Sequence, residues 1–444
     1  MDGISKKIFE FCKSDEVADS IVKRDYFYTT YISGVYANIS GRYKYFWLLQ
    51  FTLNTSISVF HMSAILRTLL ILIKVNFTLA TYLLQIFLLI QFALVVLITL
   101  TLKRHTFMRL CREMIGEFYA YLGEDHAEIL ERLKEDSWRE KKRLLAIPPA
   151  LGFIGAFCLF LAPILDSSYG EPGFNATQLR VFTDTPIPLV YPFEIPEAER
   201  KFYFYLLTGL QLLTAVFIVS LIGSAVVLFM NVIFGYTIHV QYLISTLDRI
   251  QARAAAASYL GGGGGGGQRD SSSSGQPFGK EQLYRDPASL RSLESCLKRN
   301  LRHHQKIISY FRMVQNLFGF VIGYSYSTGT LVIAMSLLSV KTGTSLPGTA
   351  LSCLMTCALE VCIMAMVSVL GQRIIDLNED LRNAVYNMKW YLSSKQVKSH
   401  VSLFLEMSLR PVELKGFGLV TCNLDTFSNV MNTAYSYYNL IMAF

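Results

Sequence analysis

The sequence predicts an all-α protein that crosses a membrane several times, and three observations carry this prediction. Of its 444 residues, 52% are hydrophobic and only 17% are charged, whereas a soluble domain usually carries about a quarter of charged residues. Apolar runs of membrane-spanning length, about 20 residues each, recur along the chain. The basic residues gather in alternate loops between those runs, which is the charge pattern of a polytopic helical protein.

Seven segments are predicted to cross the membrane as helices. The first six lie within residues 45–370, and the stretch 74–76 between the first two is short enough for a very tight turn. The fourth span is expected to continue as one helix well beyond the bilayer. The expected spans cover residues 45–73, 77–102, 144–165, 202–251, 314–340, 348–370 and 424–444.

The segments between the spans differ in composition. Residues 1–44 are polar and amphipathic, as in a helix lying at the membrane interface. The loop 166–200 is acidic and proline-rich, and it contains the glycosylation sequon at Asn175. Residues 254–280 are runs of alanine, glycine and serine, which predict a disordered insert. Residues 371–420 are polar and predicted to be helical in part.

The last segment, 421–444, is more polar than the other spans because asparagine and hydroxyl side chains interrupt it. Such groups are costly against lipid. On a helix, Thr433, Ser436 and Leu440 share one stripe, which we expect to face protein or water. Composition leaves two interpretations open: a polar seam packed against neighbouring helices, or the wall of an aqueous pore.

The distribution of basic residues predicts the orientation. Nearly all of the 41 lysines and arginines lie before the first span or in the loops after the second, fourth and sixth. The opposite side holds a short list: Lys74, Arg180, Arg200, Lys201 and Lys341. Because basic loops remain cytoplasmic, the N-terminus is predicted inside and the C-terminus outside, on the same side as the sequon.

Several protein classes fit poorly. The net charge of +8 comes from basic loops beside spans and does not indicate nucleic-acid binding. His303 and His304 sit among basic residues, which favours a solvated helix face over a metal site. We find no catalytic arrangement, so an enzyme is not predicted, and no cofactor is expected. The orientation is opposite to that of a G-protein-coupled receptor. A transporter would predict inverted repeats, and none is seen.

Four segments together resemble the insect odorant receptors. They share with that family a proline-flanked Tyr-Pro-Phe before span four, a Cys…His-Gln segment before span five, an Ala-x-Tyr…Trp segment after span six, and a C-terminal signature. In this chain the four segments are 184–194, 296–305, 384–390 and 410–437. Each motif is weak alone, but their order and spacing cover nearly the whole chain.

The resemblance implies the insect odorant-receptor channel fold, in which four chains form a ligand-gated, non-selective cation channel in the plasma membrane of a sensory dendrite. Spans one to six would then form the ligand-binding region, 371–420 a cytoplasmic anchor, and the last helix would line the pore. The implied pore and gate residues are Leu440, Ala443, Phe444, Ser436 and Thr433. The implied ligand is a small volatile molecule bound in the outer half of spans two, three, four and six. The candidate ligand-binding residues are Phe77, Tyr82, Phe157, Leu161, Tyr203, Phe204 and Met355.

The same resemblance distinguishes between branches of the family. The related gustatory receptors end in a Thr-Tyr-x5-Gln-Phe pattern, whereas Ala434-Tyr435 is not followed by Gln here. Ala443 stands where the odorant co-receptor has Gln. We therefore expect a ligand-tuning subunit that assembles with the shared odorant co-receptor in a tetramer, surrounded by membrane lipid. A gustatory-type channel, or less readily a transporter, remains the alternative.

Overall fold

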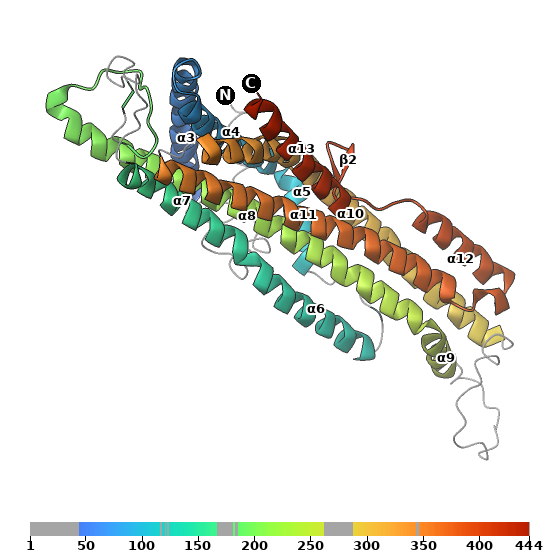
Figure 1. Cartoon of the computed structure of the whole chain (residues 1–444). Coiled ribbons are helices and arrows are strands. Elements are labelled where there is room, and N and C mark those ends of the chain that lie inside the picture. Colours follow the sequence, from blue (N-terminus) through green and yellow to red (C-terminus); the bar gives the residue numbers. More distant parts are fainter. Residues whose placement is uncertain are drawn as a thin grey trace, which may run out of the picture.

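The structure is a computed structural model, and it describes residues 44–115, 118–119, 121, 124–166, 181–182, 185–261, 287–342 and 346–443. These residues form helices and one small antiparallel hairpin (Figure 1). The helices are α3 (Lys44–Leu72), α4 (Phe77–Leu102), α5 (Arg104–Ile115), α6 (Glu124–Leu145), α7 (Ile147–Leu165), α8 (Arg200–Asp248), α9 (Ile250–Gly261), α10 (Pro287–Thr342), α11 (Pro347–Asn387), α12 (Lys395–Ser408) and α13 (Leu424–Met442). The short elements are η1 (Glu197–Glu199), η3 (Trp390–Leu392), β1 (Lys415–Gly416) and β2 (Val420–Thr421).

Six of the described helices are long and apolar enough to cross a membrane. They match the first six predicted spans. Two of them are far longer than a bilayer needs: α8 has 49 residues and α10 has 56. At 1.5 Å per residue they reach about 74 Å and about 84 Å, against about 30 Å of hydrocarbon. The predicted continuation of span four as one helix is therefore confirmed, with its end at Asp248.

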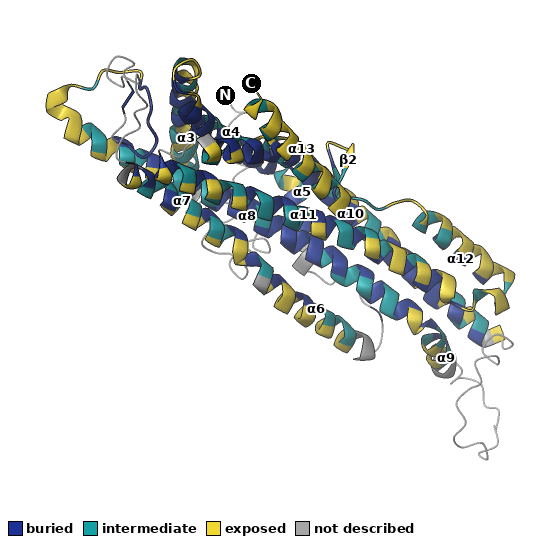
Figure 2. Cartoon of the chain, in the orientation of Figure 1, coloured by how far each residue is buried: buried dark blue, intermediate teal, exposed yellow. Residues whose placement is uncertain are grey.

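The last helix differs from the other six. It has 19 residues and contains asparagines and hydroxyls throughout, and it is not among the six candidate spans. It packs against α10 and α11, yet only Ala434 of its side chains is buried. Figure 2 shows the contrast, since α13 is largely exposed while the middles of α8 and α10 are buried.

The hairpin before α13 is fixed to α10. Gln315 of α10 brackets the backbone of Lys415, accepting from its N–H at 2.8 Å and donating to its carbonyl at 2.6 Å. One turn later, the Gly319 carbonyl accepts from the Phe417 N–H at 3.0 Å. A Cβ on Gly323 would stand 2.7 Å from the Phe417 backbone nitrogen. Gly319 and Gly323 therefore allow the hairpin to lie in close contact with α10.

Two sequence-based expectations are wrong for residues of α9 and α10. Residues 250–261, which overlap the start of the predicted disordered insert, form α9, since their alanines are the strongest helix formers. The remainder of that insert lies outside the described residues. His303 and His304 are not on a solvated face but are buried. His303 stacks on Tyr119 at 4.6 Å between ring centroids, and His304 packs on Phe404 at 4.9 Å.

Candidate functional site

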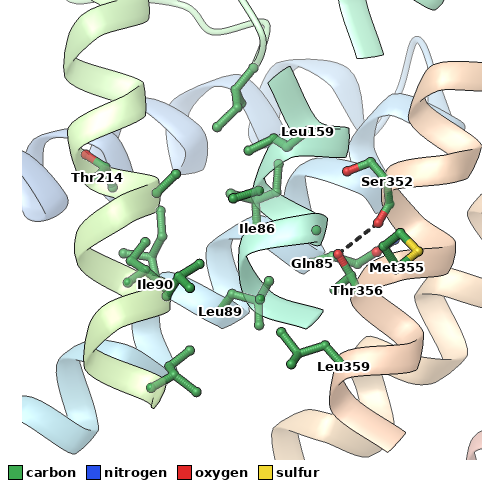
Figure 3. Close-up of a pocket in the computed structure, with 18 of the residues that line it drawn as sticks. Gln85, Ile86, Leu89, Ile90, Leu159, Thr214, Ser352, Met355, Thr356 and Leu359 are labelled. Carbon is green, nitrogen blue, oxygen red and sulfur yellow. Dashed lines mark hydrogen bonds between the residues drawn. The ribbon is translucent and has the colours of Figure 1, made fainter. Parts of the chain in front are cut away.

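A cavity of about 110 Å³ lies between α4, α7, α8 and α11 (Figure 3). These are the four helices in which a pocket was expected, and α3 and the loop before α8 each add one residue, His61 and Ile187. For scale, an engineered apolar cavity of about 150 Å³ binds benzene. The space therefore suits a molecule of a few heavy atoms to one small ring.

The walls are mostly aliphatic. Ile86, Leu89 and Ile90 of α4 and Leu359 of α11 lie around the cavity, and Figure 3 shows side chains from α4, α8 and α11 converging on it. Apolar walls of this kind favour small apolar ligands, with a few polar groups to orient them.

Small residues on α7 create the space. A Cβ on Gly152 would come within 2.9 Å of the Val219 side chain, so this glycine lets α7 approach α8 closely. At Gly155 the nearest atom to an added Cβ is Met355 Cβ at 3.9 Å, which is ordinary contact. Gly152 thus sets the distance between the helices, and Gly155 leaves room beside the cavity.

One polar residue of the wall fixes the outer loop over the cavity. The Gln211 amide accepts from the Ile187 N–H at 3.0 Å and donates to the Ile187 carbonyl at 2.9 Å. Its second N–H donates to the Tyr191 hydroxyl at 3.1 Å. On the same loop, the Val190 N–H donates to Thr68 Oγ1 of α3 at 2.8 Å. The loop that carries Tyr191 is therefore attached to α3 and α8.

A second glutamine joins the opposite side to α10. Gln85 accepts from Ser336 Oγ and donates to Ser339 Oγ, both at 2.9 Å. Thr81 Oγ1 and Ser339 Oγ lie 3.0 Å apart. All four side chains are buried. Because a buried amide must find partners within the protein, this network holds α4 and α10 together next to the cavity.

His61 is the third polar group, and it has one free nitrogen. Its Nδ1 lies 2.8 Å from Thr214 Oγ1 of α8. Its Nε2 is buried and has no hydrogen-bond partner. The side chain is 2% exposed. The imidazole is thus oriented by Nδ1, while Nε2 is buried without a hydrogen-bond partner.

The structure brings two of the seven candidate ligand-binding residues to the cavity. Tyr82 and Met355 line it. Phe77 is 49% and Phe157 is 64% exposed, on outward faces of α4 and α7. The remaining three are half-buried and lie outside the cavity lining: Leu161, Tyr203 and Phe204.

Sequence reasoning did not include the polar residues His61, Gln211 and Thr214 among the candidates. One signal was present in the chain. An ionisable side chain within a membrane span is by default a functional candidate, and His61 lies within the first span. The pairing with Thr214, 153 positions later, had no local signal.

The predicted pore residues lie on α13. Thr433, Ser436 and Ala443 are exposed, and Leu440 is 57% exposed. Thr433 and Ser436 donate to carbonyls of their own helix, at 2.7 and 2.8 Å. Phe444 and the sequon residue Asn175 lie outside the described residues.

A smaller cavity of about 50 Å³ lies next to the first, and both are bordered by Ile222 and Ile363. It is lined almost entirely by apolar residues and by Tyr326 of α10. The Tyr326 hydroxyl is 2.5 Å from Ser368 Oγ of α11. The two cavities therefore form a column with walls from α4, α8 and α11, and α10 completes the wall of the smaller one.

Comparison with known proteins identifies what the chain is similar to. A family model described as 7tm Odorant receptor matches residues 76–435. Among curated proteins, Odorant receptor 49a of Drosophila melanogaster is 28% identical over 142 residues, which is 32% of this chain and 35% of the relative. The Odorant receptor coreceptor of Harpegnathos saltator is 22% identical over 153 residues, 34% of this chain and 31% of the relative. The matched stretches thus span about a third of these relatives.

The fold also matches a solved structure. The insect olfactory receptor OR5 from Machilis hrabei, in complex with eugenol, superimposes with a TM-score of 0.73, covering 97% of this chain and all of that one. A second structure of the same receptor gives 0.68. The sequence identity is 13% in both, so this likeness concerns the fold.

Proposed function

Because this chain belongs to the 7tm odorant receptor family, we propose that it is the odorant-binding subunit of a ligand-gated, non-selective cation channel. The chain is a multi-pass membrane protein, and its family consists of receptors, not enzymes. The observation that carries the proposal is the apolar cavity between α4, α7, α8 and α11. Its size and walls suit a small volatile molecule.

The last helix is proposed to line the pore. Membrane helices normally bury polar side chains against protein, yet α13 exposes Thr433 and Ser436 in a single chain. Packing four copies around an axis would enclose that polar face. A ring of Leu440, Ala443 and Phe444 would then close the pore by dewetting, while Thr433 and Ser436 hold water below it.

A connected set of contacts supports coupling between cavity and pore. The column of two cavities reaches Tyr326, whose hydroxyl meets Ser368 of α11. The preceding turns of the same helix hold the hairpin that leads into α13 through Gln315 and Gly319. A ligand that binds the open packing of α10 and α11 more tightly than the closed one would shift the channel toward opening. Tyr324 and Tyr326 are proposed as the relay.

The proposed partner is the shared odorant co-receptor, in a tetramer in the plasma membrane. The similarity to the coreceptors of Harpegnathos saltator and Ooceraea biroi supports a common architecture for the two kinds of subunit. The orientation given by the basic loops places the N-terminus inside and α13 with its end outside.

Co-expression tests this proposal. The chain is expressed with and without the co-receptor, and currents are recorded across a panel of small volatiles. Odorant-evoked current only in the co-expressing cells is the expected result. Absence of current to every volatile contradicts the channel function, and full currents without the co-receptor contradict the role of a subunit that depends on a partner.

A cavity-filling variant tests the binding site. Gly155→Leu places a side chain next to the cavity and should raise the half-maximal odorant concentration at least tenfold. The matched control is Gly209→Leu, because Gly209 is exposed on α8 with no atom within 4 Å of an added Cβ. Equal effects of the two variants would show that the odorant binds elsewhere.

A further inference from the structure

The hydrogen bonds around His61 determine which of its nitrogens carries the proton. The Thr214 hydroxyl donates to the Leu210 carbonyl of its own helix at 3.0 Å. A hydroxyl has one hydrogen, so while Thr214 donates that hydrogen to Leu210, its Oγ1 accepts from His61 Nδ1, 2.8 Å away. In this arrangement the proton of the imidazole is on Nδ1.

The opposite tautomer is disfavoured. It would place an N–H on Nε2, where no acceptor lies, and an orphaned buried N–H is rarer and costlier than an orphaned lone pair. The charged imidazolium is disfavoured too, since a lone charge between membrane helices is expensive. His61, one of the residues that line the cavity, therefore keeps a bare lone pair on Nε2.

The other polar groups with assigned partners do not offer an equivalent site. The Gln211 amide uses its oxygen and both N–H groups on the outer loop. Thr356 donates to the Ser352 carbonyl at 3.0 Å. Gln85 is held by two serines of α10. A ligand that accepts hydrogen bonds only would leave Nε2 unsatisfied, whereas one that donates would complete the network.

We propose that the cavity selects a ligand that donates one hydrogen bond, a small apolar alcohol or phenol, with His61 Nε2 as the acceptor and Thr214 as the residue that fixes the tautomer. This inference rests on the proposed function and specifies its ligand class. A ligand that donates a hydrogen bond to a buried acceptor should bind about tenfold more tightly than an analogue of the same shape that has no donor. Alcohols should therefore exceed ketones and methyl ethers of the same shape by about that factor.

The experiment uses matched sets of one carbon frame, such as cyclohexanol, cyclohexanone and methoxycyclohexane, together with their linear counterparts. Currents are recorded from cells that express the chain with the co-receptor, and the melting temperature of the purified chain is measured with each compound. The expected result is that alcohols act at about tenfold lower concentration and stabilise the purified chain more.

Three variants test which side chains cause the preference for alcohols over ketones. His61→Phe keeps a ring but removes the acceptor, and it should abolish the difference between alcohol and ketone. Thr214→Val keeps the shape but frees the proton to move to Nε2, so ketones should gain relative to alcohols. Tyr82→Phe removes the hydroxyl of the tyrosine that lines the cavity and should keep the ratio between alcohol and ketone. A gain for ketones in Thr214→Val cannot come from misfolding.

The outcomes separate the two proposals. If ketones or ethers match alcohols in the wild-type chain, or if Tyr82→Phe and not His61→Phe removes the preference, the ligand class is wrong while the receptor function stands. If alcohols stabilise the purified chain but no compound evokes current, the channel function is wrong while the ligand class stands. No stabilisation and no current with any compound would overturn both.

Discussion

The helices around the cavity and the last helix differ in the burial and the hydrogen-bond partners of their polar side chains. Around the cavity, Gln85, Gln211 and Thr214 are buried and bonded to other segments of the chain. On α13, the hydroxyls of Thr433 and Ser436 are exposed and bond only backward to their own helix. In the first region, these three side chains therefore find their hydrogen-bond partners within one chain.

The comparison indicates which part of the molecule the proposed assembly would complete. A polar group inside a bilayer requires a partner or water. Apart from His61 Nε2, the polar side chains described around the cavity find partners within this chain, so this sequence sets the shape of the cavity. The last helix leaves its polar face and Leu440 uncovered, which is what the proposed assembly around a water-filled axis would supply. The two regions meet where the residues before α13 pack on α10 and α11.

The largest loss of function is expected from a substitution where the cavity region and the last helix meet. A Cβ at Gly371 of α11 would collide with the backbone carbonyl of Cys422, just before α13. Gly371→Ala must therefore shift α13 or α11, and we expect more than a tenfold loss of odorant-evoked current at equal surface expression. Gly209→Ala, at a helical glycine with free space, is the control. If both variants conduct alike, the close contact does not position α13.

The second-largest effect is expected from a change in the last helix alone. Leu440→Ala should raise the current without odorant several-fold, because a smaller apolar ring dewets less readily. The half-maximal odorant concentration should change less than the ligand-free current. Leu419→Ala, an 85% exposed leucine in the turn between β1 and β2, serves as the control. No rise with Leu440→Ala or with Phe444→Ala would show that the gate lies elsewhere.

A smaller effect is expected from a change confined to the cavity region. The Asp166 carboxylate, at the end of α7, accepts from the N–H groups of Gly348 and Thr349 at 2.6 and 2.8 Å and from Thr349 Oγ1 at 2.7 Å. It thereby caps α11 from another helix. Asp166→Asn replaces one accepting oxygen with a donor and should destabilise the chain by about 1–3 kcal/mol, seen as a lower melting temperature in detergent.

The control for that variant is Asp380→Asn, because Asp380 is an exposed carboxylate in the same helix, α11. It should change the melting temperature little, since surface substitutions are usually within about 0.5 kcal/mol. Equal melting temperatures for the two variants would show that Asp166 does not stabilise the contact between α7 and α11.

The smallest effect concerns the loop over the cavity. Thr68→Val removes the acceptor of the Val190 N–H and should speed hydrogen exchange of that amide about tenfold, since a net hydrogen bond contributes about 1 kcal/mol. The control is Thr52→Val, whose hydroxyl donates to the Leu49 carbonyl on an exposed part of α3. Unchanged exchange at Val190 would mean that Gln211 alone holds the loop.

The sequence by itself determined the helices and the family. Span positions follow from runs of apolar residues, and the residues around 184–194 and 410–437 carried the likeness that the family model bears out. The predicted orientation rests on the basic residues, which are counted without knowing any contact. Helix breaks followed from prolines and loops, although the alanines at 254–257 extended α9 into the stretch expected to be disordered.

Only the tertiary structure decided which faces of the helices meet. Tyr82 lines the cavity while Phe157 is outward, and nothing local distinguishes the two aromatics. In a membrane, lipid is as apolar as the protein interior, so hydrophobic periodicity does not separate inward from outward positions. The pairing of His61 with Thr214 joins helices far apart in sequence, and that juxtaposition, not either residue alone, sets the tautomer and the proposed ligand class.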